Sequence, residues 1–543
     1  MRKSLIQKNR ELLESEKGAV FKDPGGRLGI CLVYPNTYHV GMSNLGFTGL
    51  YTLLNSMDGV VCERVFLPEK NDIDRIERTR SRLVSFESGR PLNSFDAIAF
   101  SVSFENDYPN VLKILGLAKI GYYSRDRGDR DPLIIMGGPC AFINPEPLAD
   151  FMDVVFIGEA ENEIDDLVRG LGSDGHKTGR LKSLSGVNGC YIPSFYEPTY
   201  SEEGKIIKVE KIYPEAPGVI KRVYVNDLNK TILTSRLSTP HTEFKDMYLI
   251  EAMRGCPFSC RFCVAGHVYD PPRQRKPEVL TEEIENAREK GLKVGLIAPS
   301  LTEYRGITGL LDGKDVHFSI TSLRASKRSA EIVKMLKNGR SVSIAPEAGS
   351  QRLRDVVKKK ISEDDILETS ELILKSNIKN LKLYFMAGLP TETQEDIDAI
   401  IELVKKIRSL SKKGTISLTL SIFVPKPFTP FQWHPMEDEK KVRERMKIVK
   451  KALSGKGINV NHDAVRDAYM QGLLAMGDRR AGRALLKMNE HDNWKKACDE
   501  AGIDPDFYIF RKKNFDEKLP WDFIDNGIVK KELWDEYMNA MNI

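Results

Sequence analysis

The chain has 543 residues, of which 41% are hydrophobic and 29% charged, and its net charge is +5. This composition is typical of a soluble globular protein, and at about 150 residues per domain the length predicts roughly three domains. No long apolar run and no signal-peptide pattern occur, so we expect a cytoplasmic location and no membrane partner. The small net charge does not indicate nucleic acid as a partner.

Five of the eight cysteines are scattered along the chain without a pairing pattern. They are Cys31, Cys62, Cys140, Cys190 and Cys498. This distribution favours a reducing compartment. The lysine-rich segments at 358–360 and 450–451 are interpreted as solvated helix faces.

The first domain is expected over residues 1–170, where strand-like and helix-like segments alternate. The expected strands cover residues 28–34, 95–101, 133–136 and 154–157, and helices are expected through 53–54 and near 111–118. This alternation predicts an α/β fold with a doubly wound parallel sheet, whose ligands bind beyond the carboxyl ends of the strands.

Polar and glycine-rich segments follow these strands at 35–42, 101–103, 137–138 and 158–161. In order and position they resemble the rim of a cobalamin-binding Rossmann-like domain, in which a Gly-Gly pair admits the nucleotide tail. The resemblance implies that nine residues bind the corrinoid: Asn36, Tyr38, His39, Ser101, Ser103, Gly137, Gly138, Gly158 and Glu159. A flavodoxin-like domain without a cofactor is the alternative.

The first of these segments departs from the family pattern. A domain that binds cobalt through histidine carries Asp-x-His-x-x-Gly, whereas this chain has Thr37-Tyr-His39-Val-Gly-Met42. The carboxylate that would orient the imidazole is missing and the glycine is displaced. His39 is therefore either a lower ligand of the cobalt or a hydrogen-bond donor to a loop carbonyl.

A connector is expected over residues 171–247, where glycine, serine, proline and charged residues become frequent. Short β-branched runs at 205–209 and 218–224 predict a hairpin. No chemistry is assigned to this segment.

Three cysteines follow the connector with the spacing C-x3-C-x2-C: Cys256, Cys260 and Cys263. Three thiolates can hold a [4Fe–4S] cluster at three irons and leave the fourth iron open. Because His267 lies four residues after Cys263, a structural zinc site of the Cys3His type is the alternative.

Residues 248–436 are expected to form six β/α units, counting the strand that precedes the cysteines. The other strands are expected at 294–298, 317–322, 341–345, 381–386 and 416–424. This pattern predicts a partial (β/α)6 barrel, whose functional groups concentrate at the carboxyl ends of its strands.

The cysteine spacing and these barrel segments resemble the radical S-adenosylmethionine (SAM) enzymes. The resemblance implies that the open iron binds SAM and that an electron from the cluster cleaves it to a 5′-deoxyadenosyl radical. It assigns SAM contacts to Phe262, Ser322, Arg324, Glu347, Gly349, Ser350, Gly388 and Pro390. A guanidinium at Arg324 fits a carboxylate; the alternative for Arg324 and Glu347 is an ordinary ion pair at the barrel rim.

Nearly the whole chain resembles the radical SAM proteins that carry an amino-terminal cobalamin-binding domain, with further matching segments at 423–433 and 519–527. Residues 437–543 are expected to form a helical carboxyl-terminal domain with Trp494 and Trp521 in its core.

The resemblance implies a cobalamin-dependent radical SAM methyltransferase with three cofactors: a [4Fe–4S] cluster, SAM and cobalamin. Such an enzyme methylates an unactivated sp3 carbon through the 5′-deoxyadenosyl radical and methylcobalamin, and needs an external one-electron reductant. A protein residue is the expected substrate; a precedent is the methylation of glutamine in methyl-coenzyme M reductase. The alternatives are a radical rearrangement, cyclisation or RNA modification, or a non-catalytic cobalamin or redox sensor.

Overall fold

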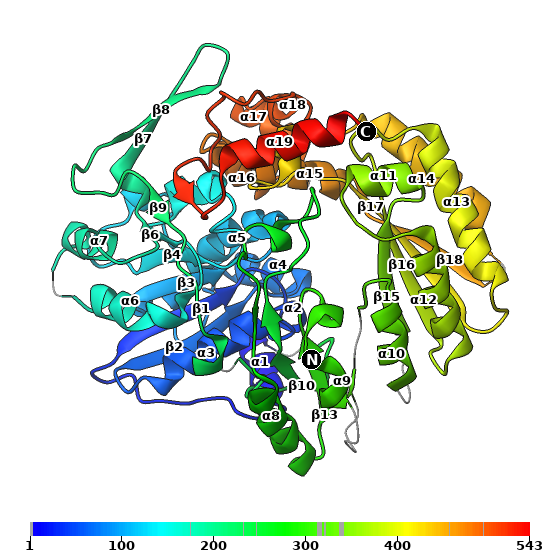
Figure 1. Cartoon of the computed structure of the whole chain (residues 1–543). Coiled ribbons are helices and arrows are strands. Elements are labelled where there is room, and N and C mark those ends of the chain that lie inside the picture. The colour runs from blue at the N-terminus through cyan, green and yellow to red at the C-terminus, as the bar shows by residue number, and fades with distance from the viewer. Residues whose placement is uncertain are drawn as a thin grey trace.

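The structure is a computed structural model that describes residues 4–173, 175–231, 233–245, 247–311, 318–319, 322–335, 341–455, 457–491 and 493–543. An amino-terminal sheet (blue and cyan in Figure 1) lies beside a second, barrel-like set of strands (green and yellow). The carboxyl-terminal helices (orange and red) lie against both.

The amino-terminal sheet has six strands in the order β2-β1-β3-β4-β5-β6. Their bounds are β1 Leu28–Tyr34, β2 Val60–Phe66, β3 Ala97–Ser101, β4 Leu133–Gly137, β5 Val154–Phe156 and β6 Cys190–Tyr191. The first five pair in parallel and β6 is antiparallel to β5. The parallel α/β sheet expected from the sequence is confirmed, and β6 extends it beyond residue 170.

The edge strand β2 was not expected, because two charged residues interrupt its apolar run. All seven of its residues are nevertheless buried. Arg64 pairs with Glu87 at 2.6 Å and with Glu16 at 2.7 Å, and Glu63 pairs with Arg90 at 3.0 Å. Burying a charged side chain costs much less free energy when it is paired than when it is isolated. The strand can therefore lie in the interior.

The order of the parallel strands is that of flavodoxin-like sheets, whose ligands bind where the strand order reverses. In this chain the reversal lies between β1 and β3. The helices of this part of the chain are α1 Leu5–Glu14, α2 Tyr38–Met42, α3 Leu45–Ser56, α4 Lys70–Thr79, α5 Tyr108–Ala118, α6 Ile164–Leu171 and α7 Lys177–Ser185.

The connector contains the expected hairpin, formed by β7 Tyr196–Tyr200 and β8 Ile206–Lys211. It projects from the upper left of the molecule in Figure 1. The second β-branched run does not join this hairpin: β9 Ile220–Lys221 pairs with β19 Ile524–Asp525 near the carboxyl terminus. Ser238 of the connector also forms an antiparallel bridge with Lys17, so the connector contacts segments near both ends of the chain.

The barrel consists of a three-stranded sheet, β10-β13-β14, and a four-stranded sheet, β15-β16-β17-β18. A parallel bridge between Ser322 and Ser343 joins them. The bounds are β10 Met247–Glu251, β13 Lys293–Ile297, β14 Phe318–Ser319, β15 Ser341–Glu347, β16 Asn380–Ala387, β17 Thr415–Ile422 and β18 Ile458–His462; β11 Met253–Arg254 and β12 Arg273–Gln274 form a separate pair. Of the strand expected at 317–322, residues 317, 320 and 321 lie outside the described part of the chain.

The strand β18 was not expected either, since only helices were expected after residue 436. It pairs in parallel with β17 and so continues the barrel sheet. Its sequence, Ile458-Asn-Val-Asn-His462, leaves most of one face polar and exposed. The pattern that marks a buried parallel strand is therefore absent. The boundary expected at residue 436, between the barrel and the last domain, stays a prediction.

The helices of the barrel cover its outer face (Figure 1). They are α8 Pro277–Glu289, α9 Ile307–Leu311, α10 Lys327–Met335, α11 Gln351–Val356, α12 Glu363–Lys375, α13 Gln394–Ser409 and α14 Glu439–Leu453. The remaining helices are α15 Val465–Met476, α16 Ala481–Met488, α17 Trp494–Ala501, α18 Pro505–Ile509 and α19 Lys530–Met541. Within the described residues, no helix is long and apolar enough to cross a membrane.

The carboxyl-terminal helices are held against the amino-terminal domain by buried polar contacts. Asn144 donates to the carbonyl oxygens of Ala475 and Gly477 at 3.0 and 2.8 Å. Arg479 pairs with Glu146 at 3.2 Å. Trp494 and Trp521 are 3% and 1% exposed, so the core positions expected for them are confirmed.

Candidate functional site

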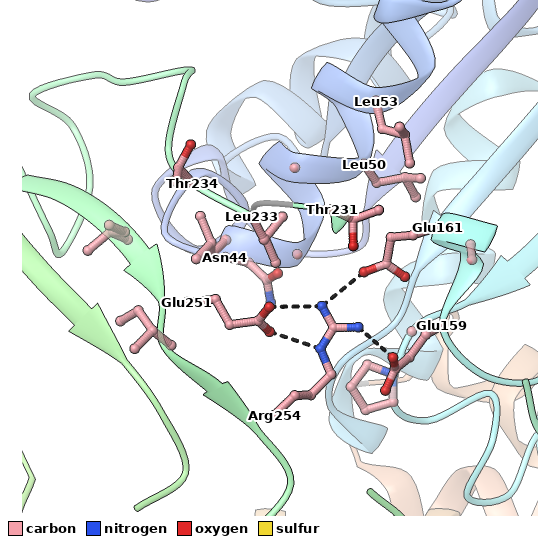
Figure 2. Close-up of a pocket in the computed structure, with 18 of the residues that line it drawn as sticks. Asn44, Leu50, Leu53, Glu159, Glu161, Thr231, Leu233, Thr234, Glu251 and Arg254 are labelled. Atoms are coloured by element: carbon pink, nitrogen blue, oxygen red, sulfur yellow. Dashed lines mark hydrogen bonds and ion pairs between the residues drawn. The ribbon is translucent and has the colours of Figure 1, made fainter. Parts of the chain in front are cut away.

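A cavity of about 870 Å³ lies between the amino-terminal sheet and the barrel (Figure 2). One side is formed by α3 and by residues at the carboxyl ends of the first sheet's strands. The opposite side is formed by β10, by residues 253–255 and by residues 297–299 after β13. Two sheets therefore present to one cavity the strand ends at which parallel sheets bind ligands.

Five of the nine predicted corrinoid contacts line this cavity: Ser101, Ser103, Gly138, Gly158 and Glu159. Two of them are glycines for steric reasons. Gly138 has φ +93°, and a Cβ there would lie 2.7 Å from the carbonyl oxygen of Val102. Gly158 has φ +125°, and a Cβ there would overlap the backbone of Val223. Each glycine thus allows another backbone segment to approach the rim of the sheet.

Four predicted corrinoid contacts do not line the cavity. Asn36 donates to Asp107 at 2.7 Å, and the hydroxyl of Tyr38 donates to Glu16 at 2.6 Å. Nδ1 of His39 lies 3.2 Å from the carbonyl oxygen of His241. A Cβ on Gly137 would meet no atom within 4 Å. Direct roles for these four residues stay predictions.

The cysteine loop, residues 255–266, lies against the same cavity. Gly255 and Ala265 line it, on either side of the three thiols. The amide of Cys256 donates to the carbonyl oxygen of Ala265 at 3.1 Å, so the loop closes on itself. Cys260 is 7% exposed, whereas Cys256 and Cys263 are partly exposed.

The geometry of this loop does not fit the zinc alternative. Nε2 of His267 lies 3.2 Å from the carbonyl oxygen of Cys260. Among the described residues, the three thiols and this imidazole do not gather within 4.8 Å of one another, as ligands of one ion would. A larger group such as a four-iron cluster accommodates thiolates that stand farther apart.

Burial raises the pKa of the Cys263 thiol to about 11 and also raises that of Cys256. Since iron binds the thiolate, ligation must release these protons. The Arg324 and Lys359 side chains act in the opposite direction on the pKa of Cys256. Positive charge beside the loop therefore favours the form that binds metal.

Two predicted SAM contacts lie beside the cysteine loop. Glu347 adds to the negative potential at Cys263 and pairs with Lys359 at 2.8 Å. The guanidinium of Arg324 lies 3.6 Å over the ring of Phe258, within the loop. Both residues remain candidates for SAM binding, and both already have protein partners.

Two lysines of this region are partly buried, which corrects the expectation for Lys358 and Lys359, whereas Lys360 is exposed as expected. The side chains of Lys358 and Lys359 are only 24% and 12% exposed, and each forms an ion pair. Lys450 and Lys451, in contrast, are exposed on α14 as expected.

Of the six other predicted SAM contacts, two have close structural partners of their own. Ser350 caps α11 by accepting from the amide of Leu353 at 3.1 Å, and its hydroxyl also bonds Asp396. A Cβ on Gly349 would overlap the backbone of α13 at Ile400. The remaining four differ in exposure: Gly388 and Pro390 are buried, Phe262 is partly buried and Ser322 is exposed. SAM binding by these six residues stays a prediction.

An ion-pair cluster that sequence analysis did not predict forms part of the cavity wall (Figure 2). The guanidinium of Arg254 contacts three carboxylates: Glu159 at 2.7 Å, Glu161 at 2.9 Å and Glu251 at 2.9 Å. Glu159 and Glu161 belong to the amino-terminal domain and Glu251 to the barrel. Arg254, two residues before Cys256, thus connects the cysteine loop to the neighbouring domain.

Two further arginines complete this cluster. Nη1 and Nη2 of Arg273 contact Glu159, at 2.9 and 2.8 Å, and Arg275 contacts Glu251 at 2.7 Å. Burial alone would raise the pKa of Glu159, but Arg273 and Arg254 bring it below its ordinary value. Glu159 therefore stays charged and joins the two domains through its ion pairs, and its contact with a corrinoid stays a prediction.

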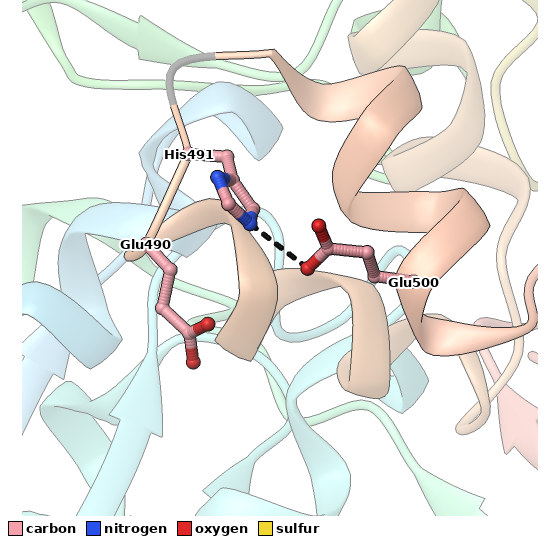
Figure 3. A group of neighbouring side chains, drawn as sticks. All are labelled: Glu490, His491 and Glu500. Carbon is pink, nitrogen blue, oxygen red and sulfur yellow. Dashed lines mark hydrogen bonds and ion pairs between the residues drawn. The ribbon is translucent and has the colours of Figure 1, made fainter.

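Within the described residues, one other group has the composition of a metal site: Glu490, His491 and Glu500 (Figure 3). Nε2 of His491 lies 2.8 Å from Glu500. The two carboxylates also have lysine partners, Lys487 at 3.0 Å and Lys496 at 3.6 Å. We interpret the group as ion pairs at the protein surface.

Comparison with known proteins agrees with the cysteine loop and the barrel. A family profile described as "Radical SAM superfamily" matches residues 250–404, and one described as "Radical SAM proteins, N-terminal" matches residues 46–193. The chain is 33% identical over 463 residues to "Uncharacterized protein MJ0966" of Methanocaldococcus jannaschii, covering 84% of this chain and 90% of that one.

Two more distant similarities cover less. "Uncharacterized methyltransferase PH0819" of Pyrococcus horikoshii is 25% identical over 292 residues, which span 50% of this chain and 58% of the relative. The cobalamin-dependent SAM radical enzyme OxsB, solved with aqua-cobalamin and SAM bound, is 17% identical with a TM-score of 0.46, and the match covers 69% of this chain and 52% of OxsB. This chain thus spans little more than half the length of either protein.

Membership of the superfamily implies a [4Fe–4S] cluster, SAM and an external reductant, and the cysteine loop supplies three ligands that fit the cluster. The chain belongs to the radical SAM superfamily, in the same family as the M. jannaschii protein.

Proposed function

We propose that the protein is a cobalamin-dependent radical SAM methyltransferase, whose corrinoid binds in the cavity between the two domains. The observation that carries this proposal is that one cavity reaches both the carboxyl edge of the flavodoxin-like sheet and the cysteine loop. When bound, cluster and SAM would supply a 5′-deoxyadenosyl radical and the corrinoid a methyl group. The protein's own part is to hold the reacting carbon between them and to exclude water.

Three observations support this proposal. Ser101 and Ser103 offer hydroxyl groups at the point where the strand order reverses. Gly46, on the cavity side of α3, adds no side chain to the cavity, whereas the side chain of Leu233 fills the space beside Gly49. The relative from P. horikoshii is itself named a methyltransferase, which supports the class of reaction.

For substrate we propose a side chain or α-carbon of a protein, for which glutamine of methyl-coenzyme M reductase is the precedent. The inner face of the barrel supports a polar substrate with many hydrogen-bonding groups. Alternate residues on β16–β18 are polar and exposed or partly exposed: Lys382, Tyr384, Ser417, Thr419, Asn459 and Asn461. The side-chain amides and hydroxyls of this face can donate to and accept from the peptide groups of an extended segment.

Methyl transfer is tested with SAM labelled in its methyl group. Anaerobically reconstituted protein, hydroxocobalamin, methyl-d3 SAM and a one-electron reductant should give labelled methylcobalamin and S-adenosylhomocysteine. If the corrinoid remains unlabelled while 5′-deoxyadenosine forms, the methyl-transfer proposal is wrong and the radical chemistry stands.

His39 offers a prediction about the lower face of the corrinoid. Its side chain is 56% exposed, its Nδ1 lies near the His241 carbonyl, and it does not line the cavity. We expect His39→Ala to leave the EPR spectrum of bound cob(II)alamin unchanged. Loss of nitrogen hyperfine splitting in the variant would show instead that the imidazole binds cobalt.

A further inference from the structure

The cysteine loop is held in place by the last helix of the chain. Arg261, between Cys260 and Cys263, is 6% exposed. Its Nε donates to Oε2 of Glu536 on α19 at 3.0 Å. Its Nη1 donates to the carbonyl oxygens of Val356 and Asp355, at the end of α11, at 2.9 and 3.2 Å. Two helices therefore meet on one side chain of the loop.

The backbone of Arg261 is fixed as well. Its amide donates to the carbonyl oxygen of Val357 at 3.1 Å, and its carbonyl oxygen accepts from the amide of Phe431 at 3.2 Å. The second carboxylate oxygen of Glu536 accepts from Nζ of Lys358 at 2.8 Å. Glu536 thus connects the cysteine loop to residues 358–360, which we call the lysine turn.

The lysine turn also contacts the loop from its other end. Arg324 donates to the carbonyl oxygens of Lys359 and Lys360 while its guanidinium covers Phe258. Lys358 and Lys360 have φ values of +55° and +51°. Non-glycine residues adopt this region only where neighbouring contacts impose it, so the turn has a conformation that its partners determine.

We propose that Glu536 is a positioning residue for the iron–sulfur cluster: through Arg261 and the lysine turn it holds the cysteine loop in the conformation that binds the cluster. Arg261 cannot reorient while both its guanidinium and its backbone are engaged. Groups that orient metal ligands typically affect metal affinity about 10–100-fold. The inference rests on the cluster that superfamily membership implies and does not involve the corrinoid.

The test uses Glu536→Gln in the full chain, reconstituted anaerobically with iron and sulfide. We expect a strong chelator to remove iron about tenfold faster than from the wild type, as loss of a group that orients ligands predicts. The matched control is Glu532→Gln, which changes an exposed residue one turn earlier on α19. Its release rate should equal that of the wild type. Lys358→Met, which removes the second partner of Glu536, should accelerate release in the same direction.

A double-mutant cycle separates this contact from general loosening of the fold. In an Arg261→Gln background, Glu536→Gln should accelerate iron release by a smaller factor than it does alone, because the effects of residues in contact are not additive. The EPR spectrum of the reduced cluster should also change in Glu536→Gln and not in Glu532→Gln. The proposal is overturned if the effects of Arg261→Gln and Glu536→Gln on the rate of iron release multiply fully. It is also overturned if Glu536→Gln and Lys358→Met both release iron at the wild-type rate. Corrinoid binding by either variant bears only on the methyl-transfer proposal.

Discussion

Replacing Cys256 by alanine is expected to reduce SAM-dependent formation of 5′-deoxyadenosine to below about 1% of wild type, since loss of groups that merely support metal ligands already costs about 10–100-fold. Cys256 is one of only three thiols in the loop, and with two thiolates left a second iron is unprotected. The iron content after anaerobic reconstitution should fall with the activity. Both quantities are measured on the same preparation, by iron assay and by chromatography of the product.

The matched control is Cys498→Ala. Cys498 is buried in α17, and this thiol is not part of the cysteine loop. The control should retain iron and activity, because it loses only the sulfur of a packed side chain. Unchanged 5′-deoxyadenosine from Cys256→Ala would rule out the radical SAM mechanism for this loop.

Replacing Arg254 by methionine is expected to lower the free energy of unfolding by about 3–5 kcal/mol, the cost of breaking a buried ion pair by removing one partner. Three carboxylates, on Glu159, Glu161 and Glu251, lose the cation they share. Arg273 and Arg275 still neutralise Glu159 and Glu251, whereas Glu161 has no other ion-pair partner among the described residues. The loss should therefore be greatest at Glu161, where the two domains meet.

The measurement is chemical denaturation of the protein without its iron–sulfur cluster, monitored by fluorescence and by circular dichroism. Arg288→Met is the matched control, because Arg288 is 54% exposed in a surface pair and its loss should cost less than about 1 kcal/mol. The loss of unfolding free energy in Arg254→Lys should lie between those of Arg254→Met and Arg288→Met, since one ammonium group cannot contact three carboxylates as a guanidinium does. Equal stability of Arg254→Met and wild type would show that the ion-pair cluster around Arg254 does not hold the domains together.

Hydrophobic patterns predicted those strands whose apolar residues are continuous or alternate regularly. The strands at 28–34, 381–386 and 416–424 have continuous or alternating apolar residues, and β1, β16 and β17 lie there. Strand β2 was not predicted, because charged residues such as Glu63 and Arg64 are usually exposed. In the fold both are buried, and their ion-pair partners compensate their charges. Those partners, Glu16, Glu87 and Arg90, lie 23 to 48 residues away and cannot be identified without the fold.

The candidate site was predictable where a short motif determines the chemistry. The spacing of the three cysteines, and the glycines and serines after the first strands, identified both sides of the cavity. The ion-pair cluster was not predicted, although Arg254, Arg273 and Arg275 stand in or beside strand-like segments where a core would not need charge. Lys358 and Lys359 in the lysine turn were wrongly interpreted as solvated; Glu536, the partner of Lys358, lies 178 residues away.

The central claim is that one cavity holds a corrinoid next to the cysteine loop, and it is tested most directly by measuring how much corrinoid the protein retains. Protein incubated with hydroxocobalamin is separated from free corrinoid by gel filtration, and the bound corrinoid is quantified by absorbance. We predict one corrinoid per chain for the wild type, and much less for Gly46→Leu, which places a large side chain in the cavity. Wild-type protein that elutes without corrinoid would contradict the claim.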